Sequence, residues 1–233
     1  MLTLYKKELN YYLNNVVGYL ILIIFAAFAN FLFVKDIFVV GTASMKSFFG
    51  IMPWLFLVFI PALGMRIFSE EKRVNTIEIL LTLPVSETQI VLAKFFAMAT
   101  LFLMSLALTL AAPISLALIA RLYLPEVIVG YLGIFLLGVS SIAIAMFFSS
   151  QTKNQIVAFL LSVLVLFFLN VLATDFLVTV LPKAITDFAS YFGPIYHLQN
   201  FIKGIVDVRS LFYFLSLLVV FLFLTVISLE KRD

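Results

Sequence analysis

The sequence predicts an all-α, polytopic membrane protein with a single transmembrane domain that covers residues 1–233. Hydrophobic residues make up 64% of the chain and charged residues 12%, whereas a typical soluble domain has about 25% charged residues. So little polar surface cannot cover a water-soluble globule. Six apolar segments are each about long enough to cross a bilayer as a helix, and the charged residues lie between them.

Residues 2–15 are predicted to form an amphipathic helix at the membrane surface. Lys6, Lys7 and Glu8 lie away from an aromatic-rich apolar side that consists of Leu2, Tyr5, Leu9, Tyr12 and Leu13. Residues 16–34 follow without a charge and form the first predicted span. A cleaved signal peptide is the alternative, because the two lysines precede an apolar segment and residues 27–29 resemble a cleavage site. The apolar run continues past residue 29, which favours a span.

Five further spans are predicted at residues 48–67, 94–120, 127–148, 156–174 and 211–229. Pro53 and Pro61 should kink the second span and Pro113 the third, because proline removes a backbone donor and clashes with the preceding turn. The polar connections before the second, fourth and fifth spans are short: 35–47, 121–126 and 149–155.

The segment 175–210 is mixed in polarity rather than apolar throughout. Apolar residues have helical spacing over 181–188, and Gly193 with Pro194 then breaks the helix. We therefore expect a pair of short helices or a re-entrant hairpin between the fifth and sixth spans. Its place is on the side of the membrane opposite residues 66–94.

The stretch 66–94 is a long polar interval between two spans, and it carries helix start and stop signals. Asn75 is a good N-cap with Glu78 at the third helical position, and the apolar spacing that follows predicts a short amphipathic helix that ends before Pro84. Ser86 begins a second capping box and starts the helix of the third span. A short helix with one apolar stripe suits docking into a groove of another protein, and a solvated interfacial loop is the alternative.

An even number of spans places both termini on one side of the membrane, and the basic residues predict that this side is the cytoplasm. The side of the termini carries the larger share: Lys6, Lys7, Arg66, Lys72, Arg73, Lys94, Lys153, Lys231 and Arg232. The other side carries Lys35, Lys46, Arg121, Lys183, Lys203 and Arg209. The segment 66–94 is then cytoplasmic as well.

The residues that several classes of function require do not occur in this chain. The apolar cores of the spans contain no Asp, Glu, Lys, Arg or His, whereas proton-coupled carriers and voltage sensors need ionisable groups at that depth. The chain has no Cys and one His, and it has no nucleotide-binding, metalloprotease or nucleophile-elbow motif. His197 is expected to be interfacial or hydrogen-bonded rather than a ligand. We therefore expect no enzyme, no cofactor bound by the chain itself and no nucleic-acid partner.

Some polar and small residues do lie inside the predicted spans. The polar ones are Asn30, Ser105, Thr109, Ser115, Ser140, Ser141, Ser162 and Asn170. Interhelical hydrogen bonds are their expected role, and lining of a substrate path is the alternative. Three glycines of the fourth span are expected to be close-packing positions: Gly130, Gly133 and Gly138.

Residues 68–94 resemble the signature of ABC-2 type transporter permeases, which are the membrane subunits of ATP-binding-cassette exporters. The pattern is an acidic-basic run, then Thr-x-Glu-x-Leu-Leu at 76–81, then Pro84, then Lys94 at the start of the next span. Residues 193–217 resemble the closing segment of the branch that includes gliding-motility-associated permeases.

The resemblance implies a homodimer or heterodimer of six-span subunits in a bacterial plasma or inner membrane, coupled to a separate cytoplasmic ATPase that binds ATP and Mg²⁺. The helix at 69–83 would be the coupling helix, with contacts from Ser69, Glu70, Glu71, Lys72, Arg73, Asn75, Thr76, Glu78, Leu81 and Pro84. The segment between the last two spans would form an outer lid with Gly193, Pro194, Tyr196, His197, Asp207 and Arg209. Asn75 stands where many relatives have Gly, and Ser210 where an acidic residue is usual.

A secondary carrier or channel that is not powered by ATP is the alternative function. Such a protein would need inverted repeats or helices broken at the membrane midplane, and the sequence has no sign of either. The apolar walls with scattered hydroxyls would suit a lipid, a polysaccharide, a peptide or a drug-like substrate equally.

Overall fold

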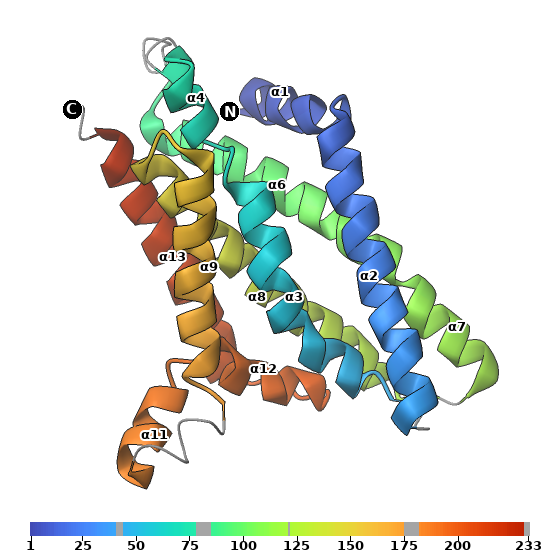
Figure 1. Ribbon diagram of the computed structural model, residues 1–233. Helices are drawn as coiled ribbons and strands as arrows, with labels where there is room; N and C mark the ends of the chain where they lie inside the picture. Colours follow the sequence, from blue (N-terminus) through green and yellow to red (C-terminus); the bar gives the residue numbers. More distant parts are fainter. Residues whose placement is uncertain (41–43, 78–84, 121, 175–181, 231–233) are drawn as a thin grey trace.

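The computed structural model describes residues 1–40, 44–77, 85–120, 122–174 and 182–230. The regular elements in these ranges are helices (Figure 1): α1 Leu2–Leu13, α2 Val16–Val40, α3 Lys46–Gly64, α4 Ser69–Arg73, α6 Glu87–Thr109, α7 Ala111–Ile119, α8 Leu124–Gln151, α9 Gln155–Val171, α11 Lys183–Ser190, α12 Pro194–Ile202 and α13 Val208–Glu230. The prediction of an all-α fold is confirmed for this part of the chain.

Five helical stretches are long and apolar enough to cross a membrane: Gly18–Lys35, Lys46–Arg73, Glu87–Ile119, Leu124–Gln151 and Val208–Glu230. The remaining predicted span, 156–174, corresponds to α9, which is apolar but has 17 residues. At 1.5 Å per residue α9 is about 26 Å long, somewhat less than the roughly 30 Å of a hydrocarbon core. The structure thus gives five spans by length and composition.

The helix α8 lies at the centre of the bundle, and α3, α6, α9, α12 and α13 pack against it. The helix α2 packs on α3 and α6 at one flank, and α1 lies across the end of the bundle beside the start of α6 (Figure 1). The helices α11 and α12 lie at the opposite end from α1 and α4. Of the segment 175–210, for which a pair of short helices or a re-entrant hairpin is predicted, the described residues form α11 and α12 with a break before Pro194.

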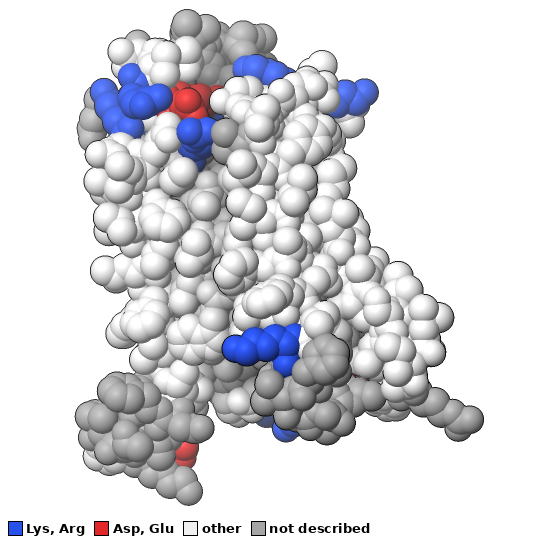
Figure 2. Space-filling model, turned by 45° about the vertical axis from the view of Figure 1, so that its right-hand side comes forward, with Lys and Arg blue, Asp and Glu red and all other residues white. Residues whose placement is uncertain are grey.

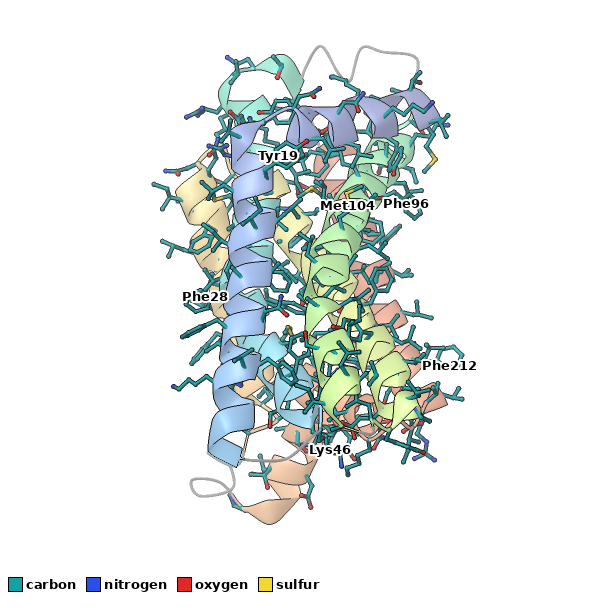
Figure 3. All side chains as sticks on the ribbon, turned by 90° about the vertical axis from the view of Figure 1, so that its right-hand side faces the viewer. Tyr19, Phe28, Lys46, Phe96, Met104 and Phe212 are labelled. Atoms are coloured by element: carbon teal, nitrogen blue, oxygen red, sulfur yellow. The ribbon has the colours of Figure 1, made fainter. Side chains whose placement is uncertain are left out.

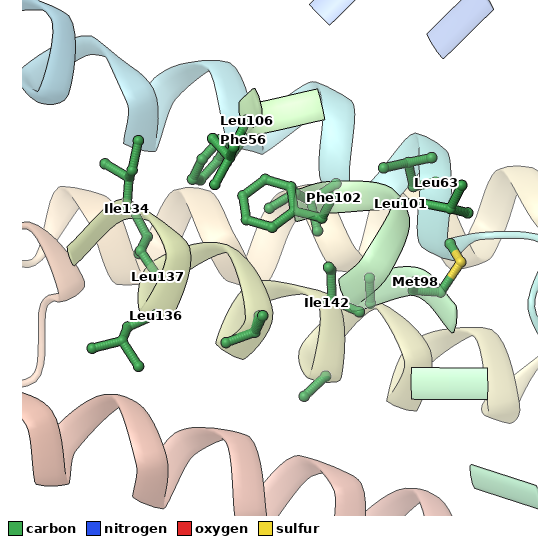
Figure 4. Packing of buried hydrophobic residues seen from close by; sticks show 14 of the residues in the cluster. Phe56, Leu63, Met98, Leu101, Phe102, Leu106, Ile134, Leu136, Leu137 and Ile142 are labelled. Carbon is green, nitrogen blue, oxygen red and sulfur yellow. The ribbon is translucent and has the colours of Figure 1, made fainter. Parts of the chain in front are cut away.

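The core is apolar and closely packed around α8. Phe102 of α6 packs against Phe56 of α3, with ring centroids 5.2 Å apart, close to Ile134, Leu137 and Ile142 of α8 (Figure 4). A Cβ atom added at Gly138 would lie 2.1 Å from the Phe102 ring, so only glycine permits this approach. The glycines of α8 are close-packing positions, as predicted.

Prolines shape two of the long helices in different ways. The helix α3 runs unbroken through Pro53 and Pro61, whereas α6 ends at Thr109 and α7 begins at Ala111, just before Pro113. Because Pro113 has no N–H, the carbonyl of Thr109 lacks its helical donor, and the Tyr131 hydroxyl donates to it at 3.2 Å. The kink predicted at Pro113 coincides with this interruption between α6 and α7, whereas the kinks predicted at Pro53 and Pro61 stay predictions.

The predicted loop 35–47 is wrong over its first half, because α2 continues to Val40. The prediction ends the helix where the charged residues Lys35 and Asp36 begin. Charge ends an apolar span, but it does not interrupt helical hydrogen bonding, and the next glycine comes only at position 41.

The polar side chains inside the bundle fall into two groups. Asn170 Nδ2 of α9 donates to the Pro53 carbonyl at 3.2 Å, and Asn30 Nδ2 of α2 to the Leu108 carbonyl at 3.4 Å. Thr109 also bonds to another helix, through Tyr131. The serines instead donate to carbonyls three or four residues earlier in their own helices: Ser105, Ser115, Ser140, Ser141 and Ser162. The expectation of interhelical bonds is confirmed for the first group and is wrong for the serines, since a serine hydroxyl reaches its own helix backbone most easily.

The surface has charged ends and an apolar middle. On the face shown in Figure 2, Lys, Arg, Asp and Glu gather at the two ends and leave a broad uncharged band between them. Figure 3 shows large apolar side chains along this band from α1 down to Lys46, namely Tyr19, Phe28, Phe96, Met104 and Phe212. They are between 37% and 67% exposed, which suits contact with lipid rather than with water.

Candidate functional site

One end of the bundle holds a buried charge cluster where three helices meet. Lys94, near the start of α6, is only 3% exposed. Its Nζ donates to Glu71 Oε1 of α4 at 2.8 Å and to the Ile67 carbonyl at 3.2 Å, and it lies 3.1 Å from Glu8 Oε1 of α1. This Lys94 cluster, which consists of Glu8, Glu71 and Lys94, ties α1 and α4 to α6.

Burial makes the Lys94 cluster costly to disturb. The three N–H donors of the ammonium face three oxygens, and the Phe68 ring centroid lies 5.4 Å from Nζ as a cation–π partner. Removing one partner from a buried ion pair costs about 3–5 kcal/mol, because the remaining charge is left uncompensated. Lys94 faces two carboxylates, and Glu71 Oε2 has no hydrogen-bond partner among the described residues. The cluster is therefore firmly held and has an excess of negative charge.

The helix α4 is also bonded to the end of α8. Ser149 Oγ accepts from the Ser69 N–H at 3.2 Å and donates to the Met65 carbonyl at 2.9 Å, to which Ser69 Oγ also donates. Lys72 Nζ donates to the Ser150 carbonyl. Ser69 was predicted to contact a partner, but it is fully buried and anchors α4 to α8 instead. Short as it is, α4 has bonded contacts with two long helices.

The outer side of α4 is charged and exposed. Glu70 lies 3.9 Å from Arg66 Nε and 3.7 Å from an Arg73 guanidinium nitrogen. Surface ion pairs of this kind contribute at most about 1 kcal/mol, so these side chains can exchange partners at little cost. Arg73 and Val74 are each more than half exposed. This side is open to a partner.

Asn75 has a different role from the one predicted. Its φ of 57° is left-handed, whereas an N-cap has extended backbone, and it directly follows Val74, the C-cap of α4. Asn75 therefore ends α4 in the position where glycine, and after it asparagine, is favoured. Helical backbone resumes at 76–77, and Thr76 Oγ1 donates to the Glu71 carbonyl at 3.4 Å.

Three predicted contact residues, Glu78, Leu81 and Pro84, lie outside the described residues. The second capping box is confirmed at its start, because Ser86 Oγ accepts from the Gln89 N–H at 3.3 Å and α6 begins there. The described part of the polar stretch thus consists of α4, a left-handed turn, a renewed helical start and a capped α6.

A hollow of about 270 Å³ lies between α1 and α4. It is lined by Lys7, Glu8, Tyr11, Tyr12, Arg66, Ile67, Glu70, Glu71, Val74, Thr76 and Lys94. Tyr12 is buried, and its burial raises the pKa of the phenol, so it stays neutral. Both carboxylates of the Lys94 cluster border this hollow, which makes the surface beside α4 charged and concave.

At the opposite end, α12 carries a buried histidine. His197 is 2% exposed, its Nε2 lies 2.9 Å from the Tyr191 carbonyl and its Nδ1 lies 3.2 Å from Ser210 Oγ. A carbonyl only accepts, so Nε2 carries the proton and Ser210 donates to Nδ1 in the neutral ring. The ring stacks on Tyr213 at 4.1 Å, and burial lowers the pKa of His197. The expectation of a hydrogen-bonded histidine is confirmed.

The other predicted outer residues surround the same helix. Asp207 Oδ1 accepts from the Arg209 N–H at 3.0 Å and so caps α13, while Asp207 Oδ2 accepts from Asn200 Nδ2 at 3.1 Å. Tyr196 and Arg209 point to the surface. Within the described ranges, no group of three or more His, Cys, Asp and Glu side chains could hold a metal ion. This end therefore has a framework of hydrogen bonds around α12 and the start of α13.

The Lys94 cluster and the buried His197 lie at opposite ends of an apolar helical bundle. The family model described as ABC-2 family transporter protein matches residues 2–229. The chain belongs to the ABC-2 transporter family. A search of the curated proteins found no match. Members of the ABC-2 family are multi-pass membrane permease subunits of ATP-binding-cassette exporters, and they associate with a cytoplasmic ATPase. The gliding-motility branch stays a prediction.

Sequence reasoning had noted Glu8 and Lys94 but had not paired them. The signal that could have done so is positional: Glu8 lies one turn before the buried Tyr12, at the border of the apolar side of α1. A carboxylate at such a border needs a buried cation, and Lys94 is the basic residue near the start of α6, the helix of the third predicted span. Because Glu8 and Lys94 are far apart along the chain, no local sequence pattern links them.

Proposed function

We propose that this ABC-2 permease is a six-span subunit that pairs with a second permease subunit and docks a separate ATPase through α4 and the residues up to 83. The Lys94 cluster carries this proposal. A force applied to a short exposed helix reaches the transport path only if that helix is rigidly joined to a long one, and Glu71 with Lys94 joins α4 to α6. Glu8 adds α1 to the same unit.

The arrangement of the ends supports six spans with both termini in the cytoplasm. The helix α9 runs from the end that holds α4 to the end that holds α11, as a sixth crossing would (Figure 1). Seventeen residues are at the lower limit of a membrane-spanning helix. The basic residues favour the α4 end as the cytoplasmic one.

The chain itself contributes no ATP hydrolysis on this proposal. ATP and Mg²⁺ belong to the partner, and the exposed side of α4, with Glu70, Arg73 and Val74, offers it charged and apolar contacts. The second permease subunit follows from the family pattern. The α11 and α12 pair would cover the outer end of the transport path. The substrate would be a lipid, a polysaccharide, a peptide or a drug-like molecule.

Site-specific crosslinking tests the docking proposal, and the chain suits it because it has no cysteine. Arg73→Cys carries a photo-crosslinker on the exposed side of α4, and Tyr196→Cys carries it at the opposite end as the matched control. In membranes that contain the partner, we expect a crosslink to an ATP-binding protein from position 73 and none from position 196. A crosslink from position 196, or from neither position, would contradict the proposal.

A further inference from the structure

A second hollow lies at the same end of the molecule as the Lys94 cluster, where α8 and α13 end beside α4. Its volume is about 490 Å³. Its polar wall includes Lys72, Lys153 and Ser228, and its apolar wall includes Leu224 and Ile227. A polar wall and an apolar wall in one hollow are suited to an amphiphilic ligand.

The charge in this hollow is positive and unbalanced. Lys72 and Lys153 both line it, and its lining contains no carboxylate. Lys72 Nζ donates to the Ser150 carbonyl, and neither lysine forms an ion pair with a described residue. Lys94, by contrast, faces two carboxylates. Two ammonium groups that share one hollow favour an anion between them.

A hydroxyl group is available to the same anion. Ser150 Oγ donates to the Phe147 carbonyl at 2.7 Å, and Ser228 Oγ lies 3.0 Å from Ser150 Oγ. The Ser228 hydroxyl also lies 3.4 Å from the Ser150 carbonyl. Rotation of the Ser228 hydroxyl toward an anionic oxygen would exchange these neutral partners for a charged acceptor, which forms the stronger hydrogen bond.

The apolar wall continues into the uncharged band of the surface. Val220, Leu224 and Ile227 recur at intervals of four and three residues, so they lie on one face of α13. Val220 is 51% exposed and Leu224 36%. This stripe extends from the hollow along α13 toward the middle of the bundle, where an acyl chain would lie.

We propose that this hollow binds the phosphate headgroup of an anionic phospholipid from the adjacent leaflet. The two lysines and Ser228 hold the phosphate, and the α13 stripe holds one acyl chain. Basic hollows between helices at a membrane surface recognise anionic headgroups in this way. Because Lys72 belongs to α4, a bound lipid would brace the docking helix; that consequence rests on the proposed function, whereas the binding itself does not.

The test uses the purified chain alone in neutral detergent, so its outcome is independent of any ATPase. Native mass spectrometry measures how much phosphatidylglycerol and phosphatidylcholine the chain retains from an equal mixture. We expect the wild-type chain to prefer phosphatidylglycerol and the Lys72→Gln/Lys153→Gln variant to lose that preference by about tenfold. The variant Lys6→Gln/Lys7→Gln removes the same charge at the same end, on α1, and should change the preference less than about threefold.

Three results would each overturn the assignment. The wild-type chain could show no preference for phosphatidylglycerol, or both double variants could lose that preference to the same extent. Inorganic phosphate could also stabilise the chain as much as the lipid does. The last would make the hollow a site for free anions. A Lys72→Gln/Lys153→Gln chain that keeps its lipid preference but no longer copurifies the ATPase would assign the lysines to the protein partner. Lys153→Gln alone guards against misfolding, since Lys153 is exposed, and it should lower the preference in the same direction.

Discussion

The side chain of Lys94 shows how one buried charge can organise several helices. Its ammonium would be costly to bury alone, and the chain offsets that cost with two carboxylates from helices far apart in sequence. Neither α1 nor α4 is long, so their positions depend on such contacts more than on their own helical stability.

Replacing Lys94 with methionine should therefore destabilise the protein by about 3–5 kcal/mol, because the buried Glu8 and the half-buried Glu71 would be left without a cation. The triple variant Lys94→Met/Glu8→Gln/Glu71→Gln should recover most of this loss. Denaturant unfolding in detergent, followed by the fluorescence of Trp54, the one tryptophan, measures both. A Lys94→Met chain as stable as the wild type would mean that the cluster is solvated.

The buried ring of His197 should make the α12 end sensitive to acid. Burial lowers the pKa of His197 below its ordinary 6.5, and nearby Asp207 opposes that shift only in part. The unfolded chain then binds a proton that the folded chain resists, so stability is constant above pH 6.5 and falls as the pH drops from 6.5 toward the lowered pKa. Hydrogen exchange over α12 should accelerate in that window, and His197→Gln should show a flat profile. Equal acceleration in both chains would assign the effect to another group.

Residue types explain which roles could be anticipated. Asparagine is favoured both as an N-cap and in left-handed backbone, so the type of Asn75 fits either role, and only its φ decides. Ser86 is less ambiguous, because serine followed three residues later by glutamine is typical of the N-terminus of a helix. The pairing of Lys94 with Glu8 depends on the packing of α1 across α6, which local pattern does not contain.

At the scale of elements, the break between α6 and α7 shows how the bundle replaces a lost backbone bond. Pro113 frees the carbonyl of Thr109, and the hydroxyl of Tyr131 from α8 takes the place of the missing N–H. The third span can bend there because its neighbour supplies the donor.

A double-mutant cycle tests this substitution of donors. Tyr131→Phe should cost about 1–3 kcal/mol of unfolding free energy, because the fully buried Thr109 would keep an unpaired carbonyl. In a Pro113→Ala background the alanine N–H can reach the same carbonyl, so the cost of Tyr131→Phe should fall below about 1 kcal/mol. Equal costs in the two backgrounds would show that Tyr131 acts through its ring contacts alone.

Element boundaries were predictable wherever a residue type interrupts the backbone. The break at Gly193 and Pro194, the interruption between α6 and α7 that precedes Pro113, and the start of α6 at Ser86 all have such a cause. The end of α2 was misplaced because charge marks where the lipid should end and carries no information on where helical bonding stops.

At the scale of the whole molecule, two charged ends enclose an apolar band, and each end has its own structure. One end has α1, α4 and both hollows, and the other has the α11 and α12 pair with its histidine. The apolar segments predicted the order of the helices, and five of the six correspond to helices long enough to cross a membrane, because hydrophobicity along the chain reports burial in lipid directly. They could not give the position of α1 across the bundle or the two hollows, which depend on side chains from several helices.

The helix α9 decides whether the chain crosses the membrane five or six times. If α9 crosses, residues before and after it lie on opposite sides of the membrane, even though it is only about 26 Å long. Lys153 precedes α9 and Asp187 follows it, and both are exposed. In the cysteine-free chain, Lys153→Cys should react with a membrane-impermeant maleimide only after the cells are opened, and Asp187→Cys should react in intact cells. The unsubstituted chain is the control and should not react. Reaction of both variants from the same side would leave α9 outside the bilayer, place the termini on opposite sides and remove the basis for six spans.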